Sequence, residues 1–335
     1  MNVTGEPRIP ISLIVDDPCP GLHLYYTHAA RRNPAALTGD GRPLLRFIPN
    51  GLLREFIAVT EEFGLRGKFS VVPQPSCAGS INSSLDGVPP DEMRGWLDLV
   101  RTRVAPCFDI TPEMITHDWA IDLDTMQPLT ENEHDWSQHQ DQAALRRYIA
   151  YALGELKSAR FDATGVTSPW AFGLEVEDAY ARAVLKAEEL VFGRSQTWYF
   201  LRSSDAPGTQ AEVMILEPQA AGPPRSCVSV IATVGDMLWR TMDYPGADDE
   251  YIGSIADQYL TLDGTGGRIA AALADGCEIV LCTHWQSLFS NGTHAGLRAL
   301  AEVARRVRET LGDRVEWLRC SELAAQAVAR KVAAL

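Results

Sequence analysis

The chain alternates short apolar runs with stretches in which apolar residues recur at helical spacing. The apolar runs, which predict strands, lie at 12–16, 67–73, 113–119, 162–169, 197–201, 211–216, 228–234, 277–285 and 315–320. The amphipathic stretches, which predict helices, lie at 50–64, 90–104, 141–159, 175–191, 250–275, 294–311 and 321–335. The clearest helix is 141–159, whose apolar stripe consists of Leu145, Tyr148, Ile149, Ala152, Leu153 and Leu156.

This repeated strand–helix alternation predicts the fold class. Near-continuous apolar strands are typical of parallel strands that are buried on both faces. No G-x-G-x-x-G follows an early strand, which disfavours a doubly wound dinucleotide-binding sheet. We therefore expect an α/β protein with one domain, 1–335, folded as a distorted (β/α)7-8 TIM-like barrel. Loops rich in Gly, Pro and Ser predict a loop or hairpin insertion around 203–226.

Polar residues gather where the predicted strands end, which is where barrels of parallel strands carry their chemistry. These strand-end residues are Asp16 and Asp17; His117, Asp118 and Asp122; Ser168 and Trp170; Asp236; and His284, Trp285 and Gln286. Taken alone, the pair Asp16–Asp17 fits a solvated turn as well as it fits a metal site or an acid–base pair. Several acids and imidazoles at one end of successive strands favour a site. Asp with His is a ligand set typical of zinc or another divalent metal.

Competing chemistries have weaker support in the sequence. No G-x-S-x-G motif indicates a serine hydrolase. Cys282 precedes His284 by two residues, so a strand would place both side chains on one side, and a thiol mechanism stays an alternative. Adjacent carboxylates on a strand point to opposite faces and would not by themselves flank a glycosidic bond. Tryptophans near the strand ends are interpreted first as caps of the core and second as a platform for a sugar ring.

Taken in order, these segments resemble the polysaccharide deacetylase superfamily, also known as carbohydrate esterase family 4 or the NodB-homology group. The resemblance rests on VDDP (15–18), GKFSVVP (67–73), TSPWAFG (167–173), GDMLW (235–239) and VLCTHWQSL (280–288). It implies a distorted (β/α)7 barrel and a metal-dependent deacetylase. It also implies Asp16 as general base, Asp17 and His117 as metal ligands, and His284 as general acid. The candidate substrate-binding residues are Ser168, Trp170, Asp236 and Trp285.

The chain departs from the family pattern at two places that matter. The family supplies two histidine ligands four residues apart, but Ile121 stands four residues after His117. The candidates for the third ligand are, in order, His139, His134 and Asp122. Ser168 replaces the family's arginine, which leaves the residue that would hold the general base unassigned.

Composition and charge limit the classes of molecule that the protein can bind and its location in the cell. With 30 Lys and Arg against 44 Asp and Glu, the net charge is −14, which argues against a nucleic acid or an anionic membrane as partner. The seven cysteines form no C-x-x-C pair, and we interpret them as reduced thiols. Residues 1–10 lack a basic region followed by an apolar run, and no apolar stretch reaches about 18 residues. We expect a cytoplasmic protein and leave its oligomeric state open.

The leading functional hypothesis is a metal-dependent hydrolase of C–N amide bonds that deacetylates an N-acetylated sugar or a related small amide. Its cofactor would be a divalent metal, zinc first, with nickel, cobalt or manganese as alternatives. One alternative is a metal-free carbohydrate-active hydrolase or isomerase that uses Asp16, Asp17 and Asp236 on the same barrel. Another is a sugar-binding barrel without catalysis.

Overall fold

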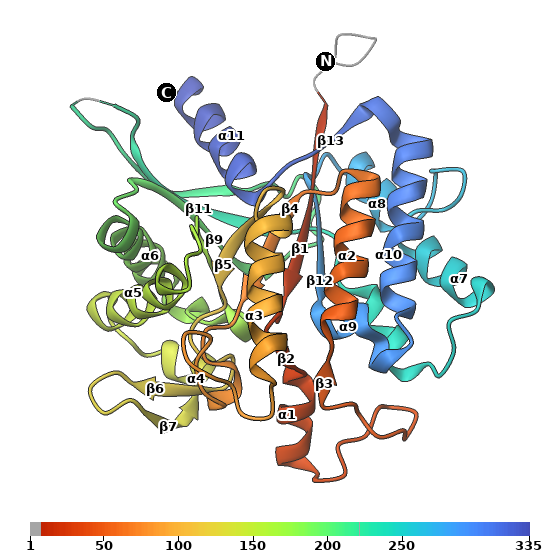
Figure 1. Ribbon diagram of the computed structural model, residues 1–335. Coiled ribbons are helices and arrows are strands. Elements are labelled where there is room, and N and C mark those ends of the chain that lie inside the picture. The colour runs from red at the N-terminus through yellow and green to blue at the C-terminus, as the bar shows by residue number, and fades with distance from the viewer. Residues whose placement is uncertain (1–7, 221) are drawn as a thin grey trace.

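Strands fill the centre of the molecule and helices surround them (Figure 1) in a computed structural model that describes residues 8–220 and 222–335. The N-terminal residues 1–7 of the segment interpreted above therefore lie outside the described residues. The strands are β1 (Ile9–Asp16), β2 (Gly21–Leu22), β3 (Phe47–Ile48), β4 (Gly67–Val71), β5 (Phe108–Pro112), β6 (Trp119–Asp122), β7 (Gln127–Asn132), β8 (Val166–Thr167), β9 (Gln196–Ser203), β10 (Glu212–Glu217), β11 (Arg225–Ala232), β12 (Ile279–His284) and β13 (Val315–Trp317). The α-helices are α1 (Leu24–Arg32), α2 (Asn50–Phe63), α3 (Pro90–Leu99), α4 (Glu133–Ser137), α5 (Gln142–Ser158), α6 (Glu177–Phe192), α7 (Asp249–Tyr259), α8 (Arg268–Ala274), α9 (Trp285–Phe289), α10 (Ala295–Arg306) and α11 (Cys320–Ala333).

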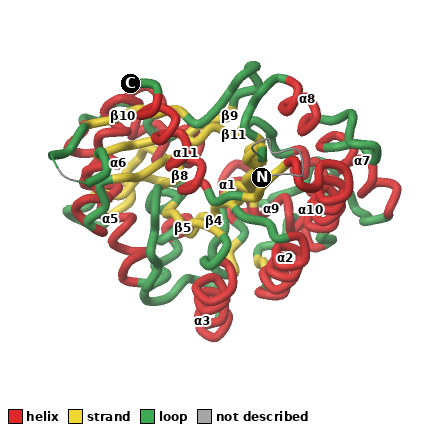
Figure 2. The backbone as a smooth tube through the Cα atoms, turned by 90° about the horizontal axis from the view of Figure 1, so that it is seen from above, coloured by secondary structure: helices red, strands yellow, loops and turns green. Residues whose placement is uncertain are grey.

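Seven of the described strands follow one another around the centre in chain order. Parallel ladders join β12, β1, β4 and β5 in one sheet and β8, β9 and β11 in another. Single parallel bridges, Glu113 to Thr167 and Val234 to Leu281, connect the two sheets at both seams. Seen from above in Figure 2, the strands lie inside a surround of helices. The predicted distorted barrel is confirmed, with a single bridge in place of a ladder at each seam.

Alternate residues of these strands face two different environments. One set packs outward under the helices, as Phe69 and Phe108 do against Phe56 of α2. The other set meets in a second apolar cluster with α11, to which β9 and β11 contribute Trp198, Phe200, Val228 and Val230. On β1, β4, β5 and β8 the residues that alternate with the outward set are largely polar and still buried, and they include Ser12, Lys68, Ser70, Asp109, Thr111 and Thr167. These strands can therefore place charged groups inside the protein.

The periodicity located α2, α3, α5, α6, α10 and α11, whereas the stretch 250–275 divides into α7 and α8, and α1, α4 and α9 were not predicted. All six residues of the predicted stripe on α5 are buried, and Asp141 caps that helix through its side chain. The predicted end of α2 is confirmed by Gly64, which has the left-handed φ of 66° that glycine tolerates. Asn50, the first residue of the predicted helix 50–64, does not cap that helix. Pro49 is the N-cap, and the Asn50 side-chain amide donates to the backbone oxygen of Glu92 at 2.9 Å.

The predicted strand at 113–119 is wrong. The third barrel strand is β5, and 113–118 forms a loop before β6 begins at Trp119. In β5 the apolar Phe108 and Ile110 alternate with the buried polar Asp109 and Thr111, so this strand lacks a continuous apolar run. The difference matters for the site because His117 lies on a loop and not at the end of a strand.

The remaining elements lie at the edges. β10 pairs antiparallel with β11, where Gly/Pro/Ser-rich loops predicted a hairpin, and β6 forms a hairpin with β7 that the sequence did not indicate. The domain bounds 1–335 remain a prediction, since residues 1–7 and 221 lie outside the described residues. Within the described part of the chain, every helix is too short or too polar to cross a membrane.

Candidate metal and catalytic site

A cavity of about 420 Å³ opens at the carboxyl ends of the barrel strands. Its polar lining includes Asp16, Asp17, Glu113, His117, His284 and Gln286. The structure thus brings together four residues that the sequence analysis selected as base, ligands and acid, although they are up to 268 positions apart. Glu113 and Gln286 complete the lining.

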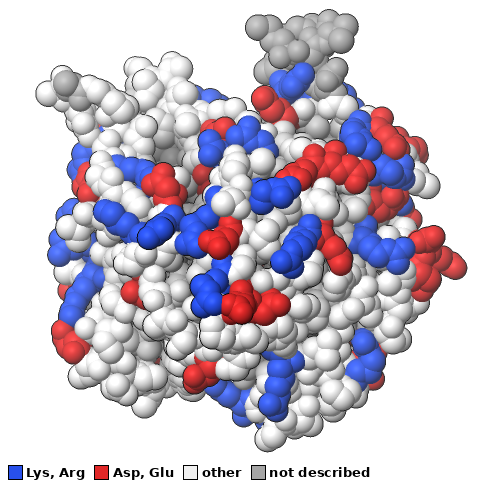
Figure 3. All heavy atoms as spheres, viewed as in Figure 1, with Lys and Arg blue, Asp and Glu red and all other residues white. Residues whose placement is uncertain are grey.

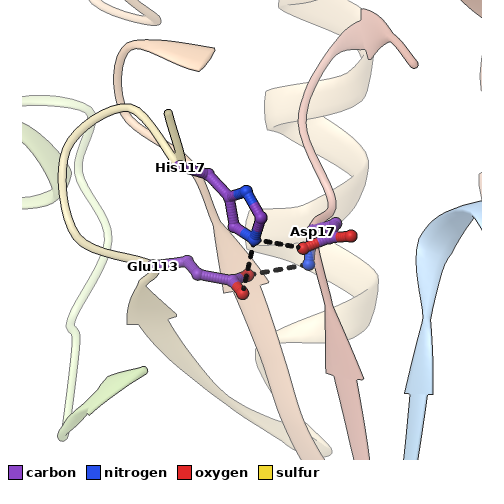
Figure 4. A group of neighbouring side chains, drawn as sticks. All are labelled: Asp17, Glu113 and His117. Carbon is purple, nitrogen blue, oxygen red and sulfur yellow. Dashed lines mark hydrogen bonds and ion pairs between the residues drawn. The ribbon is translucent and has the colours of Figure 1, made fainter. Parts of the chain in front are cut away.

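Asp17, Glu113 and His117 form a compact group, here named the acid–histidine cluster (Figure 4). His117 Nε2 lies 2.8 Å from Asp17 Oδ1 and 3.4 Å from Glu113 Oε1. The backbone N–H of Asp17 donates to Glu113 Oε2 at 2.7 Å. One ligand atom from each residue lies within 4.8 Å of the other two, and all three residues are buried. Three convergent ligands of this kind could hold a divalent metal.

The acid–histidine cluster sets two buried carboxylates around one imidazole. Burial opposes ionisation of Asp17, but the neighbouring His117 outweighs it and lowers the pKa of Asp17. Burial likewise opposes protonation of His117, yet Asp17 and Glu113 raise the pKa of His117 well above its ordinary value. Although Asp17 Oδ1 lies beside His117 Nε2, it has no hydrogen-bond donor with acceptable geometry. These side chains therefore fit a metal ion, which would replace the imidazolium proton as the positive charge.

Backbone strain accompanies this cluster. Asp17 and His117 have φ values of 69° and 53°, a left-handed conformation that costs a non-glycine residue on the order of 1–2 kcal/mol. The buried Glu133 offsets this at His117, because its carboxylate accepts N–H groups from Ile115, Thr116 and His117 at 2.8–2.9 Å. Burial raises the pKa of Glu133 to about 7. Glu133 thus fixes the loop that carries His117.

Asp16 is held by a lysine that the sequence analysis did not select. Lys68 of β4 is fully buried, and its ammonium donates to Asp16 Oδ1 and, at 2.7 Å, to Ser70 Oγ. Burial is the larger influence on Asp16 and raises its pKa to about 6, although the charge of Lys68 lowers it. Lys68 thus contacts the Asp16 carboxylate from β4, while Ser168 stands at the family's arginine position. The signal was present in GKFSVVP (67–73), where the polar Lys68 and Ser70 alternate with apolar residues.

His284 and Asp236 form a second charged pair across the cavity. The parallel register of β1 and β12 sets His284 beside Asp16. Asp236 Oδ2 lies 2.8 Å from His284 Nδ1 and accepts the Ser287 hydroxyl at 2.6 Å. Burial disfavours the imidazolium, but the hydrogen bond to Asp236 and the charges of Asp17 and Asp16 outweigh it and raise the pKa of His284 to about 10. The ring is therefore protonated at neutral pH, with Nδ1 committed to Asp236.

Two predicted substrate contacts lie on the cavity. Trp170 is 46% exposed, and its ring centroid lies 4.5 Å from that of His117. Ser168 also lines the cavity, although its hydroxyl is already hydrogen-bonded to the Tyr180 hydroxyl at 2.7 Å. Trp170 is therefore the more available of the two for a ligand.

Neither of the other two predicted substrate contacts lines the cavity. Trp285 is 1% exposed and packs edge-on against Phe56 and Phe69 in the core, where it acts as a cap of the core. The oxygens of Asp236 are occupied by His284 and its neighbours, so this residue orients the imidazole and does not face a substrate.

None of the predicted third ligands joins the acid–histidine cluster. His139 is exposed and lies 3.7 Å from Glu131. His134 lines a neighbouring cavity, and the Asp122 carboxylate accepts backbone N–H groups in a turn at the end of β6. Glu113 takes the third place instead. The sequence analysis missed it because 113–119 was predicted as a strand, which hid the strand end at Pro112.

Comparison with known proteins identifies the fold. No family model matches the sequence, and no curated protein matches it. One similar solved structure is described as a "putative polysaccharide deacetylase" from Mycobacterium smegmatis; it is 14% identical, the match covers 98% of this chain and 93% of that one, and the TM-score is 0.50. The two chains share a fold. The resemblance to the polysaccharide deacetylases is therefore confirmed for the barrel.

Two further solved structures are more distant. One is a CE4 family pseudoenzyme from Bacillus anthracis, 9% identical, with 83% of this chain and 62% of that chain covered and a TM-score of 0.39. The other is a 4-alpha-glucanotransferase from Thermococcus litoralis, 12% identical, with 96% of this chain and 40% of that chain covered and a TM-score of 0.45. At these TM-scores neither likeness informs the reaction.

Proposed function

We propose that the protein is a metal-dependent hydrolase of C–N amide bonds that deacetylates an N-acetylated sugar or a related small amide. One observation carries the proposal. The acid–histidine cluster shares a single cavity with a lysine-bound Asp16 and a protonated His284. Ligands, a base and an acid thus meet at the carboxyl end of a polysaccharide deacetylase-like barrel.

The acid–histidine cluster would hold the metal. Asp17, Glu113 and His117 supply two carboxylates and one imidazole, a set that suits zinc, with cobalt, nickel or manganese as alternatives. When bound, a divalent metal polarises the amide carbonyl and lowers the pKa of water. Gln286 donates to Asp17 Oδ2 at 2.7 Å and so fixes the carboxylate that would act as ligand.

Asp16 would act as the general base. With a pKa of about 6 it is ionised at neutral pH and still basic enough to accept a proton from the attacking water. The ammonium of Lys68 fixes the orientation of the carboxylate through Oδ1. Lys68 is therefore a positioning residue for the base.

His284 would act as the general acid. Its raised pKa of about 10 keeps a proton on the ring, which is needed to protonate the nitrogen of the leaving amine. Asp236 binds Nδ1 and leaves Nε2 as the nitrogen that delivers the proton. The products are a carboxylic acid and a free amine.

The thiol alternative finds no support in the chemistry of Cys282. This residue lines the same cavity, and its sulfur lies 3.6 Å from Asp16 Oδ2. Burial and the charge of Asp16 raise the pKa of Cys282 well above its ordinary value. The thiol stays protonated, and a protonated thiol is a poor nucleophile.

The proposal includes a small-molecule or carbohydrate substrate and a cytoplasmic location, and it excludes nucleic acids and membranes as partners. The net charge of −14 supports that exclusion. So does the face seen in Figure 3, on which Lys and Arg are interspersed with Asp and Glu.

Metal analysis and acetate release from N-acetylated sugars test the proposal together. We expect about one metal ion per wild-type chain, lost in Asp17→Ala together with activity. Asp122→Ala is the matched control, because it removes an aspartate that lies outside the cluster. Metal-free wild-type protein that turns over a glycoside would support the metal-free enzyme instead. Metal-free protein that binds sugars without turnover would support the sugar-binding barrel.

A further inference from the structure

A second cavity, of about 400 Å³, adjoins the catalytic one. The two share His28 and Trp170 as lining residues, so a ligand could extend from one into the other. The second cavity is further lined by Arg31 and Arg32 in the last turn of α1 and by Trp119 at the start of β6. We name it the arginine–tryptophan cavity.

The arginine–tryptophan cavity carries one uncompensated positive charge. The guanidinium of Arg31 is paired with the buried carboxylate of Asp118 and lies 5.2 Å from the ring centroid of Trp119. The exposed Arg32 side chain has no hydrogen bond or ion pair within residues 8–220 and 222–335. A free cation in a cavity favours an anionic ligand.

Two partly exposed indoles supply apolar surface beside that charge. Trp170 is 46% exposed and lies in a tight turn with φ of 44°, with its ring centroid 5.0 Å from that of His28. Trp119, half-buried, lies under the guanidinium of Arg31. Indole faces suit the C–H faces of a sugar ring, and a rigid ring loses little entropy on binding.

We propose that the arginine–tryptophan cavity binds a sugar unit that carries a carboxylate. Arg32 binds the carboxylate, and Trp170 stacks on the ring. One surplus guanidinium matches the single charge of a carboxylate, which it can bind through two parallel hydrogen bonds. The substrate is then an acidic saccharide whose N-acetylated unit lies in the catalytic cavity. This last step rests on the proposed function, whereas the binding of the acidic unit does not.

A binding experiment without turnover tests the site. The purified full chain is titrated with glucuronic acid and with glucose, and the change in tryptophan fluorescence is followed. We expect at least tenfold tighter binding of glucuronic acid by the wild type, a preference that Arg32→Gln abolishes. Arg54→Gln is the control, because it removes an exposed arginine of α2 that lines neither cavity and should keep the preference. Equal binding of the two sugars by the wild type, or a preference that survives in Arg32→Gln, would overturn the proposal.

Kinetics separate this proposal from the catalytic one. The substrates are N-acetylglucosamine linked to glucuronic acid and, as the neutral comparison, di-N-acetylchitobiose. We expect Arg32→Gln to lower the ratio of kcat/KM, acidic over neutral, about tenfold. A preference in binding without hydrolysis of either sugar supports the cavity and contradicts the deacetylase. Hydrolysis of both sugars with a ratio that Arg32→Gln does not change supports the deacetylase and contradicts the cavity.

Discussion

Two pairs of an aspartate and a histidine lie at the carboxyl ends of the barrel strands, and they differ in how many hydrogen bonds their polar atoms make. In Asp236–His284 the carboxylate is bonded by Thr283, Ser287, and both the backbone and the ring of His284. His284 has extended backbone, with φ of −112°.

The other pair, Asp17–His117, is built in the opposite way. Asp17 Oδ1 and His117 Nδ1 are buried without a hydrogen bond, and both residues have left-handed φ. A fully bonded pair determines where a proton sits. A strained pair with unused lone pairs, next to a second carboxylate, is suited to take up a further ligand. The contrast supports proton transfer for the first pair and metal binding for the second.

The largest expected effect on activity comes from a substitution in the Asp17–His117 pair. Asp17→Asn keeps the shape of the side chain and removes the charge that attracts a metal. We expect loss of the metal and a fall in kcat/KM on the order of 10³-fold or more. Metal content and acetate release measure both, with Asp122→Asn as the control. Retained metal in Asp17→Asn would contradict the assignment of the cluster.

Substitutions in the fully hydrogen-bonded pair, Asp236–His284, should leave the metal in place. Asp236→Asn removes the negative charge that stabilises the imidazolium, so the pKa of His284 falls from about 10 toward its ordinary value. Because the acid must be protonated, activity would then be lost as pH rises through neutrality, whereas the wild type keeps it to about pH 10. Removing the acid altogether in His284→Gln should lower kcat by about 10²–10⁴-fold. The pH profile of kcat/KM checks this, and an unshifted basic limb in Asp236→Asn would argue against His284 as the acid.

A substitution of Lys68 tests whether the proposed base, Asp16, depends on its ion pair with that lysine. Lys68→Gln leaves the buried Asp16 without its cation, so we expect the free energy of unfolding to fall by about 3–5 kcal/mol. The pKa of Asp16 should rise because the lowering influence of Lys68 is lost, and the acidic limb of the activity profile should move to higher pH. Urea denaturation measures stability. The double variant Lys68→Met with Asp16→Asn should recover much of it, and a double variant as unstable as Lys68→Gln would contradict the pairing.

Glu188, which does not line the cavity, should make the stability of the protein depend on pH independently of the two aspartate–histidine pairs. Burial raises the pKa of Glu188 from 4.5 to about 7, although Arg194 lowers it. The folded state therefore binds this proton more tightly than the unfolded state. Its contribution is fully present below pH 4.5 and is lost as pH rises to about 7, by roughly 3 kcal/mol. Unfolding of Glu188→Gln between pH 4.5 and 8 should lack this decline. An unchanged decline would place its origin elsewhere.

Sequence periodicity predicted the parts of the molecule that depend on local pattern. The stripe of α5 and the end of α2 follow from residue spacing alone. Asp16 and His284 could be grouped because each closes an apolar strand, and parallel strands place their ends together.

The remaining features depend on contacts between distant segments. Glu113 and His117 are set by a loop that the side chain of Glu133 holds, and no apolar pattern encodes such a bond. Lys68 faces inward because of the register of β4, which fixes its alternation relative to Phe69. Trp285 caps the core, as the first interpretation of the tryptophans expected, and its partners Phe56 and Phe69 come from distant segments.

The position of α11 has a consequence for access to the cavity. This helix lies across the amino-terminal side of the strands and joins their apolar cluster through Leu323, Ala327 and Val328, while the Asp109 carboxylate accepts N–H and O–H groups from Ser321 (Figure 1). The helix thereby covers the barrel at the end opposite the cavity. Under the proposed function, substrate and products would share the opening of the cavity at the carboxyl ends of the strands. Accumulated products would then obstruct the next substrate, so turnover should slow as product builds up.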